Sequence, residues 1–175
     1  MRFKLVSSLF LLFSITACTG GEQGESNIKP AKNAVDVTTK DYLQFMEESL
    51  NTTTLLYSRL SPEVAKRIKK VEMPPEAKEV ASCLIAKIKK EGLTREYKEL
   101  IEVNRQYVDY IKNTPTLTMQ NLVDDPKFNE IQTLMQSETS ERFTDITKEC
   151  GVISMNIKLS SEMGVTEALK YLPEE

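Results

Sequence analysis

Few residues of this chain could carry chemistry. The 175 residues include three Cys but no His and no Trp. The lack of His excludes His-based catalytic triads, His-containing zinc sites and the commonest general base. Adjacent carboxylates occur at three places: Glu47-Glu48, Asp124-Asp125 and Glu174-Glu175. Neighbours in a helix point about 100° apart and do not converge on one substrate, so we expect solvated acids. The sequence predicts no catalytic residue, metal ligand or cofactor.

The N-terminus has the pattern of an exported protein. Two cations precede an apolar run, Leu5–Ile15, which contains only Ser as polar residues. The run is about half the length that a membrane-spanning helix requires, so residues 1–17 predict a secretory signal peptide.

The end of that run resembles the lipobox of bacterial lipoproteins. Ile15-Thr16-Ala17-Cys18 gives an aliphatic residue, a tolerant position, a small residue and Cys. The resemblance covers residues 1–18 only. It implies a diacylglycerol (palmitate-type acyl chains) on the Cys18 thiol and cleavage before Cys18, and two or three acyl chains would hold the protein to a membrane. Thr19 rather than Asp after the Cys implies the periplasmic face of the outer membrane. The alternative is a plain secreted protein in which Cys18 is incidental.

If Cys18 carries lipid, two cysteines remain. Export places them in an oxidising compartment, so we expect a disulfide between Cys83 and Cys150. On the chain-entropy model, closing a loop of this length stabilises the fold by about 4 kcal/mol. The alternative is two buried free thiols that never meet. A redox-active pair is not expected, because the Cys-x-x-Cys spacing is absent.

The charge of the chain argues against nucleic acid as a partner. The formal net charge is −3, from 23 Lys and Arg against 26 Asp and Glu, and removal of Arg2 and Lys4 with the signal peptide makes it −5. Nucleic acid binding calls for a concentrated basic face. One basic cluster could contact anionic lipid, lipopolysaccharide or an acidic protein. It comprises Lys66, Arg67, Lys69 and Lys70. The alternative is a solvated helix face.

The hydrophobic periodicity predicts helices only. No segment alternates with the period of two that indicates a strand. The expected helices cover about 39–60, 62–72, 76–90, 94–113, 126–163 and 166–172, with a short turn within 118–123. A Thr run predicts a bend in the first helix, and the polar residues 136–140 mark a break or bend in the fifth.

Several helix ends have recognisable caps. Thr38-x-x-Asp41 resembles a capping box. The expected N-terminal caps of three later helices are Ser61, Thr94 and Asp125. In the long late helix one apolar series predicts the buried face, and it carries Cys150 with it: Phe143, Ile146, Cys150, Ile153 and Ile157. Tyr107 and Tyr110 could border a groove or form the edge of the core.

These elements predict an all-α antiparallel bundle of four to five amphipathic helices with one disulfide. The expected organisation is a signal peptide over 1–17, a lipidated Cys and flexible tether over 18–37, and a helical domain over 38–175. This layout resembles that of the secretin pilotins, which are small helical lipoproteins that carry a partner to the outer membrane. The resemblance is one of layout only, and no residue motif supports it. It implies a non-enzymatic, membrane-anchored envelope protein that binds or assembles another envelope protein, through an apolar groove that takes an amphipathic helix. The alternatives are an inhibitor, immunity or exclusion lipoprotein, and an enzyme that uses carboxylates from two helices.

Overall fold

The computed structural model describes residues 37–171, and in that range the chain forms helices and no strand. The α-helices are α1 (Thr39–Ser58), α2 (Pro62–Ala65), α3 (Glu76–Lys90), α4 (Thr94–Asn113), α5 (Pro126–Ser137), α6 (Glu141–Glu149), α7 (Val152–Met163) and α8 (Val165–Ala168). Two 3₁₀ turns, η2 (Leu122–Asp124) and η3 (Leu169–Tyr171), complete the fold. The predicted all-α bundle is confirmed.

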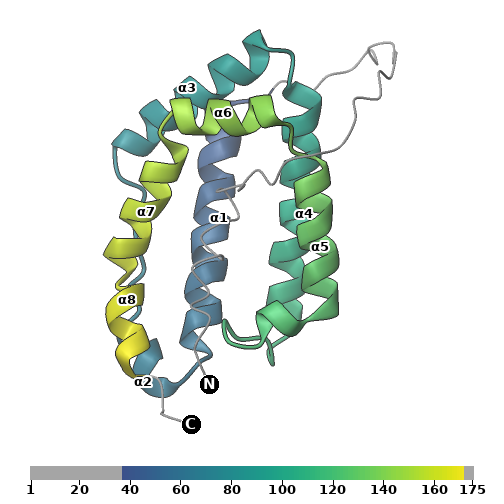
Figure 1. The fold of residues 1–175 in the computed structure, drawn as a ribbon. Helices are drawn as coiled ribbons and strands as arrows, with labels where there is room; N and C mark the ends of the chain where they lie inside the picture. Colours follow the sequence, from purple (N-terminus) through teal and green to yellow (C-terminus); the bar gives the residue numbers. More distant parts are fainter. Residues whose placement is uncertain (1–36, 172–175) are drawn as a thin grey trace.

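The helices α1, α4, α5 and α7 run along the bundle, and α3 and α6 lie across one end of it (Figure 1). The helix α5 runs opposite to α4 and α7 opposite to α5, whereas α1 and α4 are neighbours that run in the same direction. Their first turns meet where the rings of Tyr42 and Tyr97 are 6.5 Å apart. Their last turns meet where the Arg59 guanidinium donates to the carbonyl oxygens of Ile111 and Thr114.

One continuous apolar core fills the bundle. Its largest fully buried side chains come from seven elements: Tyr42, Leu56, Leu84, Ile88, Tyr97, Tyr107, Ile111, Leu122, Phe128, Ile131, Ile146 and Leu159. Burying side chains of this size stabilises a fold by about 1.5–3 kcal/mol each, before entropy is counted. The core also includes Val37, the last residue of the predicted tether.

Most of the predicted caps are present. Thr38 and Asp41 form a reciprocal capping box, and the side chains of Ser61 and Asp125 accept backbone N–H bonds at the starts of α2 and α5. The prediction for Thr94 is wrong, because the capping residue of α4 is Leu93 and it makes no side-chain cap. The preceding Gly92 has a φ of 75°, and this turn sets the start of α4 without a polar cap.

The predicted bend at the Thr run does not occur. The hydroxyls of Thr52, Thr53 and Thr54 each donate to the carbonyl four residues earlier, at 2.8–2.9 Å. These bonds satisfy the hydroxyls inside the helix, so α1 continues through all three residues.

The helix predicted over 62–72 ends at Ala65. Beyond it the backbone N–H of Lys69 donates to the carbonyl oxygen of Met163, at 3.0 Å. A tertiary bond to the end of α7 thus replaces the helical bond that would have continued α2.

The stretch 126–163, for which a break or bend at 136–140 is predicted, forms three helices. Ser137 ends α5 within the polar stretch, and Gly151, with a φ of 75°, separates α6 from α7. This break rotates the second half, so that Ile153 is half-buried and Ile157 is 64% exposed. The buried face of α7 is instead Val152, Met155, Leu159 and Met163. Cys150 is buried, as its place in the series predicts.

Candidate functional site

A groove of about 530 Å³ lies between the first halves of α1 and α4. We call it the α1–α4 groove. It is bounded by Val37, Asp41, Gln44, Phe45 and Glu48 on one side and by Tyr97, Lys98, Glu99, Ile101, Glu102 and Arg105 on the other. Because α1 and α4 start at the same end of the bundle, their two walls run in parallel.

The floor of the groove is apolar and aromatic. Val37, Phe45 and Tyr97 are buried, and Ile101 is half-buried. Behind them the ring of Tyr42 stacks on Phe45 with centroids 6.0 Å apart and lies tilted against Tyr97. The spacing of these rings is typical of favourable aromatic pairs.

Three buried polar groups of α1 and α4 have no hydrogen-bond partner in the described structure. They are the hydroxyls of Tyr42 and Tyr97 and the side-chain nitrogen of Asn104. Burial raises the pKa of Tyr42, with a smaller contribution from Tyr97. Burial also raises the pKa of Tyr97, and the negative charge of Asp41 adds to it. Buried polar groups normally have partners, so a hydroxyl or amide nitrogen without one costs stability.

The rim of the groove is charged. On the α4 wall, Glu99 pairs with Arg95 at 3.3 Å and Glu102 pairs with Arg105 at 3.5 Å. On the α1 wall, Asp41 accepts the capping-box bonds of Thr38, and Glu48 accepts from Gln44 at 3.1 Å.

Sequence reasoning did not identify this groove. The sequence does place Tyr42 and Phe45 beside the stripe of the first helix and Tyr97 and Ile101 on the stripe of the fourth. What it lacks is the pairing of the two helices, which depends on the tertiary path of the chain.

The predicted basic cluster lies elsewhere, on the segment after α2. Lys66 and Arg67 both pair with Glu63, at 3.0 and 3.2 Å. The side-chain hydrogen bond from Lys66, followed by its charge and the bond from Arg67, lowers the pKa of Glu63. Arg67 also stacks 3.5 Å from the ring centroid of Tyr171. Half of the cluster is therefore engaged in local contacts, and only Lys69 and Lys70 extend from it as exposed cations without a side-chain partner among residues 37–171.

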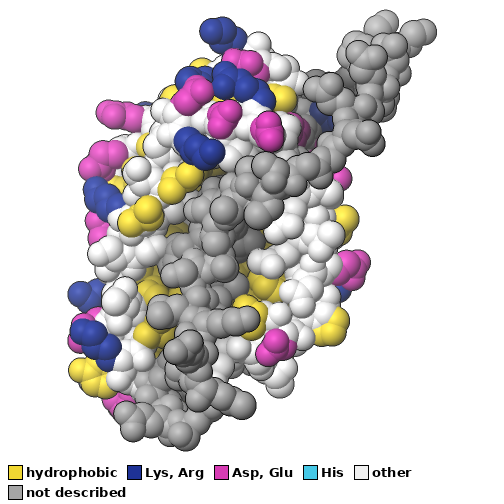
Figure 2. Space-filling model, in the orientation of Figure 1, with side chains coloured by type: hydrophobic (Ala, Val, Ile, Leu, Met, Phe, Trp, Pro, Cys, Tyr) yellow, Lys and Arg dark blue, Asp and Glu magenta, His cyan; other side chains and the backbone are white. Residues whose placement is uncertain are grey.

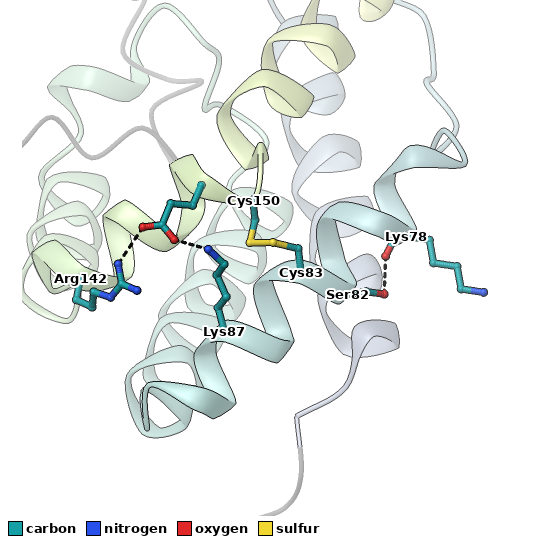
Figure 3. The surroundings of a disulfide bond; sticks show 7 residues. Lys78, Ser82, Cys83, Lys87, Arg142 and Cys150 are labelled. Carbon is teal, nitrogen blue, oxygen red and sulfur yellow. Dashed lines mark hydrogen bonds and ion pairs between the residues drawn. A yellow bond between two sulfur atoms is a disulfide. The ribbon is translucent and has the colours of Figure 1, made fainter.

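The predicted disulfide between Cys83 and Cys150 is confirmed. It joins α3 to the C-terminal end of α6, with the two Cα atoms 5.6 Å apart. Lys87 and Arg142 both pair with Glu149. Figure 3 shows the side chains of Lys87 and Arg142 pointing toward one carboxylate beside the disulfide. Arg142 also pairs with Glu91 at 2.7 Å. Over the α6 end of the molecule, cations and anions intermingle on the surface (Figure 2).

The other predicted candidates do not meet at one site. Tyr107 is fully buried in the core, and the half-buried Tyr110 donates to Asp125 at 2.9 Å, so neither borders the α1–α4 groove. Asp125 is a helix cap, as expected. Cys18 and the pair Glu174-Glu175 lie outside the described residues.

Within residues 37–171, no group of three or more Cys, Asp and Glu side chains has an arrangement that could hold a metal ion. None of the helices in that range combines the length and the apolar character that a membrane-spanning helix requires. The chain matches no protein-family model, no curated protein and no solved structure.

Proposed function

We propose that this chain is a lipid-anchored protein of the bacterial cell envelope, whose helical domain binds another envelope protein. The lipobox pattern that ends at Cys18 supports the anchor. The observation that carries the binding role is the α1–α4 groove, with its apolar floor and its charged rim.

The composition of the groove fits a protein partner. Protein interfaces combine a desolvated apolar centre, often aromatic, with a polar rim that stays in contact with water. Here Phe45, Tyr97 and Ile101 supply the centre, and the charged side chains of both helices supply the rim. Two parallel helices also present ridges between which a third helix can pack.

An enzyme based on carboxylates is less well supported. The groove does bring acids from two helices together, but Glu99 and Glu102 are each paired with an Arg of their own helix. Asp41 and Glu48 remain, both on α1. They lie seven residues, or about 10 Å, apart along the helix axis, farther than two carboxylates that act on one bond.

Site-specific photo-crosslinking in cells tests the binding role. A photoreactive residue replaces Ile101 in the groove of the full-length protein, and Ile157, exposed on α7, is the matched control. We expect one predominant envelope protein, identified by mass spectrometry, crosslinked from position 101 and absent from position 157. No adduct from 101, or the same adducts from both positions, would contradict the proposal. A captured enzyme of foreign origin would instead favour an inhibitor or immunity role.

Labelling with a palmitate analogue tests the anchor separately. We expect the full-length protein to take up the label and to fractionate with the outer membrane. The Cys18→Ser variant should lose the label, whereas the Cys83→Ser variant should retain it. Label that persists in Cys18→Ser would show that the lipid is not on this residue.

A further inference from the structure

The charges on the two walls of the α1–α4 groove are unequal. The acids of α4 are each neutralised by an Arg of the same helix, whereas Asp41 and Glu48 on α1 have no cationic partner within residues 37–171. Lys98 on the α4 wall has no acidic partner in the same part of the chain. The uncompensated charge is thus negative along the α1 wall and positive at one point of the α4 wall.

We propose that the partner in this groove is a basic amphipathic helix. It places two cationic side chains seven residues apart against Asp41 and Glu48, an acidic side chain opposite Lys98, and aliphatic side chains between them over Phe45 and Ile101. This inference rests on the proposed function and names the chemistry of its partner.

The spacing of the acids leads to this partner. Residues seven apart lie on nearly the same face of a helix and about 10 Å apart along its axis. A second helix that lies alongside repeats its own side chains at the same interval, so Lys or Arg at positions i and i+7 meets both carboxylates. Long basic side chains can also lay their apolar stems along the floor while their charges reach the rim.

The negative charge of Asp41 lies close enough to the Tyr97 hydroxyl at one end of the groove to act on it. Tyr97 lines the groove, is 2% exposed and has a hydroxyl with no partner in the described structure. Asp41 lines the same groove. Because the Tyr97 hydroxyl is covered, a lysine ammonium or arginine guanidinium of the partner would pair with the Asp41 carboxylate and not with Tyr97.

Binding of designed peptides to the full-length protein in detergent tests this inference. The first probe is a 15-residue helix with Lys at i and i+7, Leu at i+3 and i+4, and Glu on the opposite edge. The second exchanges every Lys for Glu and every Glu for Lys. By fluorescence anisotropy we expect the first probe to bind about tenfold more tightly, and the difference to shrink as salt is added. Equal affinities for the two probes would overturn the proposal.

Charge reversal in the protein provides the matched control. Glu48→Lys should weaken the first probe about tenfold and strengthen the second, whereas Glu47→Lys, on the exposed neighbour outside the groove, should change neither. Asp41 is left unchanged because it belongs to the capping box. An equal effect of the two substitutions would mean that net charge, rather than the groove, determines binding.

Other occupants give different results in the same experiments. A second copy of the chain would make the first probe dissociate a dimer, seen by light scattering, and a segment of this chain that precedes Val37 would exclude the probe until that segment is removed. Either result overturns the proposed partner. If crosslinking from position 101 captures a protein whose binding is insensitive to Glu48→Lys, the charge pattern is wrong and the proposed function stands. If position 101 captures nothing while the protein still prefers the first peptide, the proposed function is wrong and the inferred charge preference of the groove stands.

Discussion

The contact between α3 and α6 and the contact between α1 and α4 are built in opposite ways. At the first, the Cys83–Cys150 disulfide and the ion pairs of Glu149 and Arg142 join two helices whose charges are matched. At the second, two buried hydroxyls and an amide nitrogen have no partner among residues 37–171, and a groove lies above an aromatic floor.

This contrast separates the parts of the molecule that hold the fold from the part that is available for binding. Satisfied polar groups and a covalent link stabilise a contact, whereas unsatisfied buried groups cost stability until something pairs with them. Proteins keep such costs where they serve a function. The α1–α4 contact is therefore expected to gain most from a ligand, and the α3–α6 contact least.

The largest expected effect is loss of the disulfide. The two cysteines are 67 positions apart in the sequence, and opening a loop of this size lowers the free energy of unfolding by about 4 kcal/mol on the chain-entropy model. Urea unfolding of the Cys83→Ser/Cys150→Ser variant, compared with the parent under non-reducing conditions, measures it. A change in the free energy of unfolding below about 1 kcal/mol would show that the disulfide does not make the α3–α6 contact more stable than the α1–α4 contact.

A smaller effect should distinguish a tyrosine whose hydroxyl has a hydrogen-bond partner from one whose hydroxyl has none in the described structure. The Tyr110 hydroxyl donates to Asp125, so Tyr110→Phe should cost about 1 kcal/mol of unfolding free energy. The Tyr97 hydroxyl has no partner in the described structure, so Tyr97→Phe should be neutral or stabilise the fold by up to about 1 kcal/mol. Chemical denaturation of both variants measures the difference. Equal destabilisation by the two would mean that Tyr97 has a partner, such as ordered water, and would weaken the contrast.

The smallest effect concerns the exposed ion pairs beside the disulfide. The side-chain bonds from Lys87 and Arg142 lower the pKa of Glu149 below its usual value near 4.5, and the bond from Arg142 lowers that of Glu91. A carboxyl with a lowered pKa in the folded state stabilises the fold above its usual pKa, and that stability is lost as the pH falls through the folded value. The melting temperature of Glu149→Gln should thus lie slightly below that of the parent at pH 7. The gap should close as the pH falls through the lowered pKa of Glu149, and also in high salt, because Glu149 and its partners Lys87 and Arg142 are exposed.

Much of the fold could be predicted from the sequence because its signals are local. The capping box at Thr38, the proline start at Asp125 and the three-four periodicity over 94–113 each depend on a few neighbouring residues, and the structure has all three. The disulfide followed from counting cysteines once one was assigned to lipid, which is an argument about chemistry and needs no coordinates.

The errors arise where tertiary structure overrides a local pattern. The apolar series through Ile153 and Ile157 assumed an unbroken helix, but Gly151 takes a left-handed conformation and changes the buried face. The α1–α4 groove could not be predicted for a related reason. It depends on which helices become neighbours, and the chain must pass through α2 and α3 before α4 returns beside α1.

The disulfide also determines how the domain would carry a mechanical load. The loop closed by Cys83 and Cys150 contains the whole of α4, α5 and α6, whereas α1 lies outside it. Tension applied through the residues before Val37 enters α1 directly and has no covalent path to that loop except through α2 and α3. Such a pull loads the α1–α4 groove before it loads the cross-linked loop, so the walls of the groove would separate while residues 83–150 stay joined.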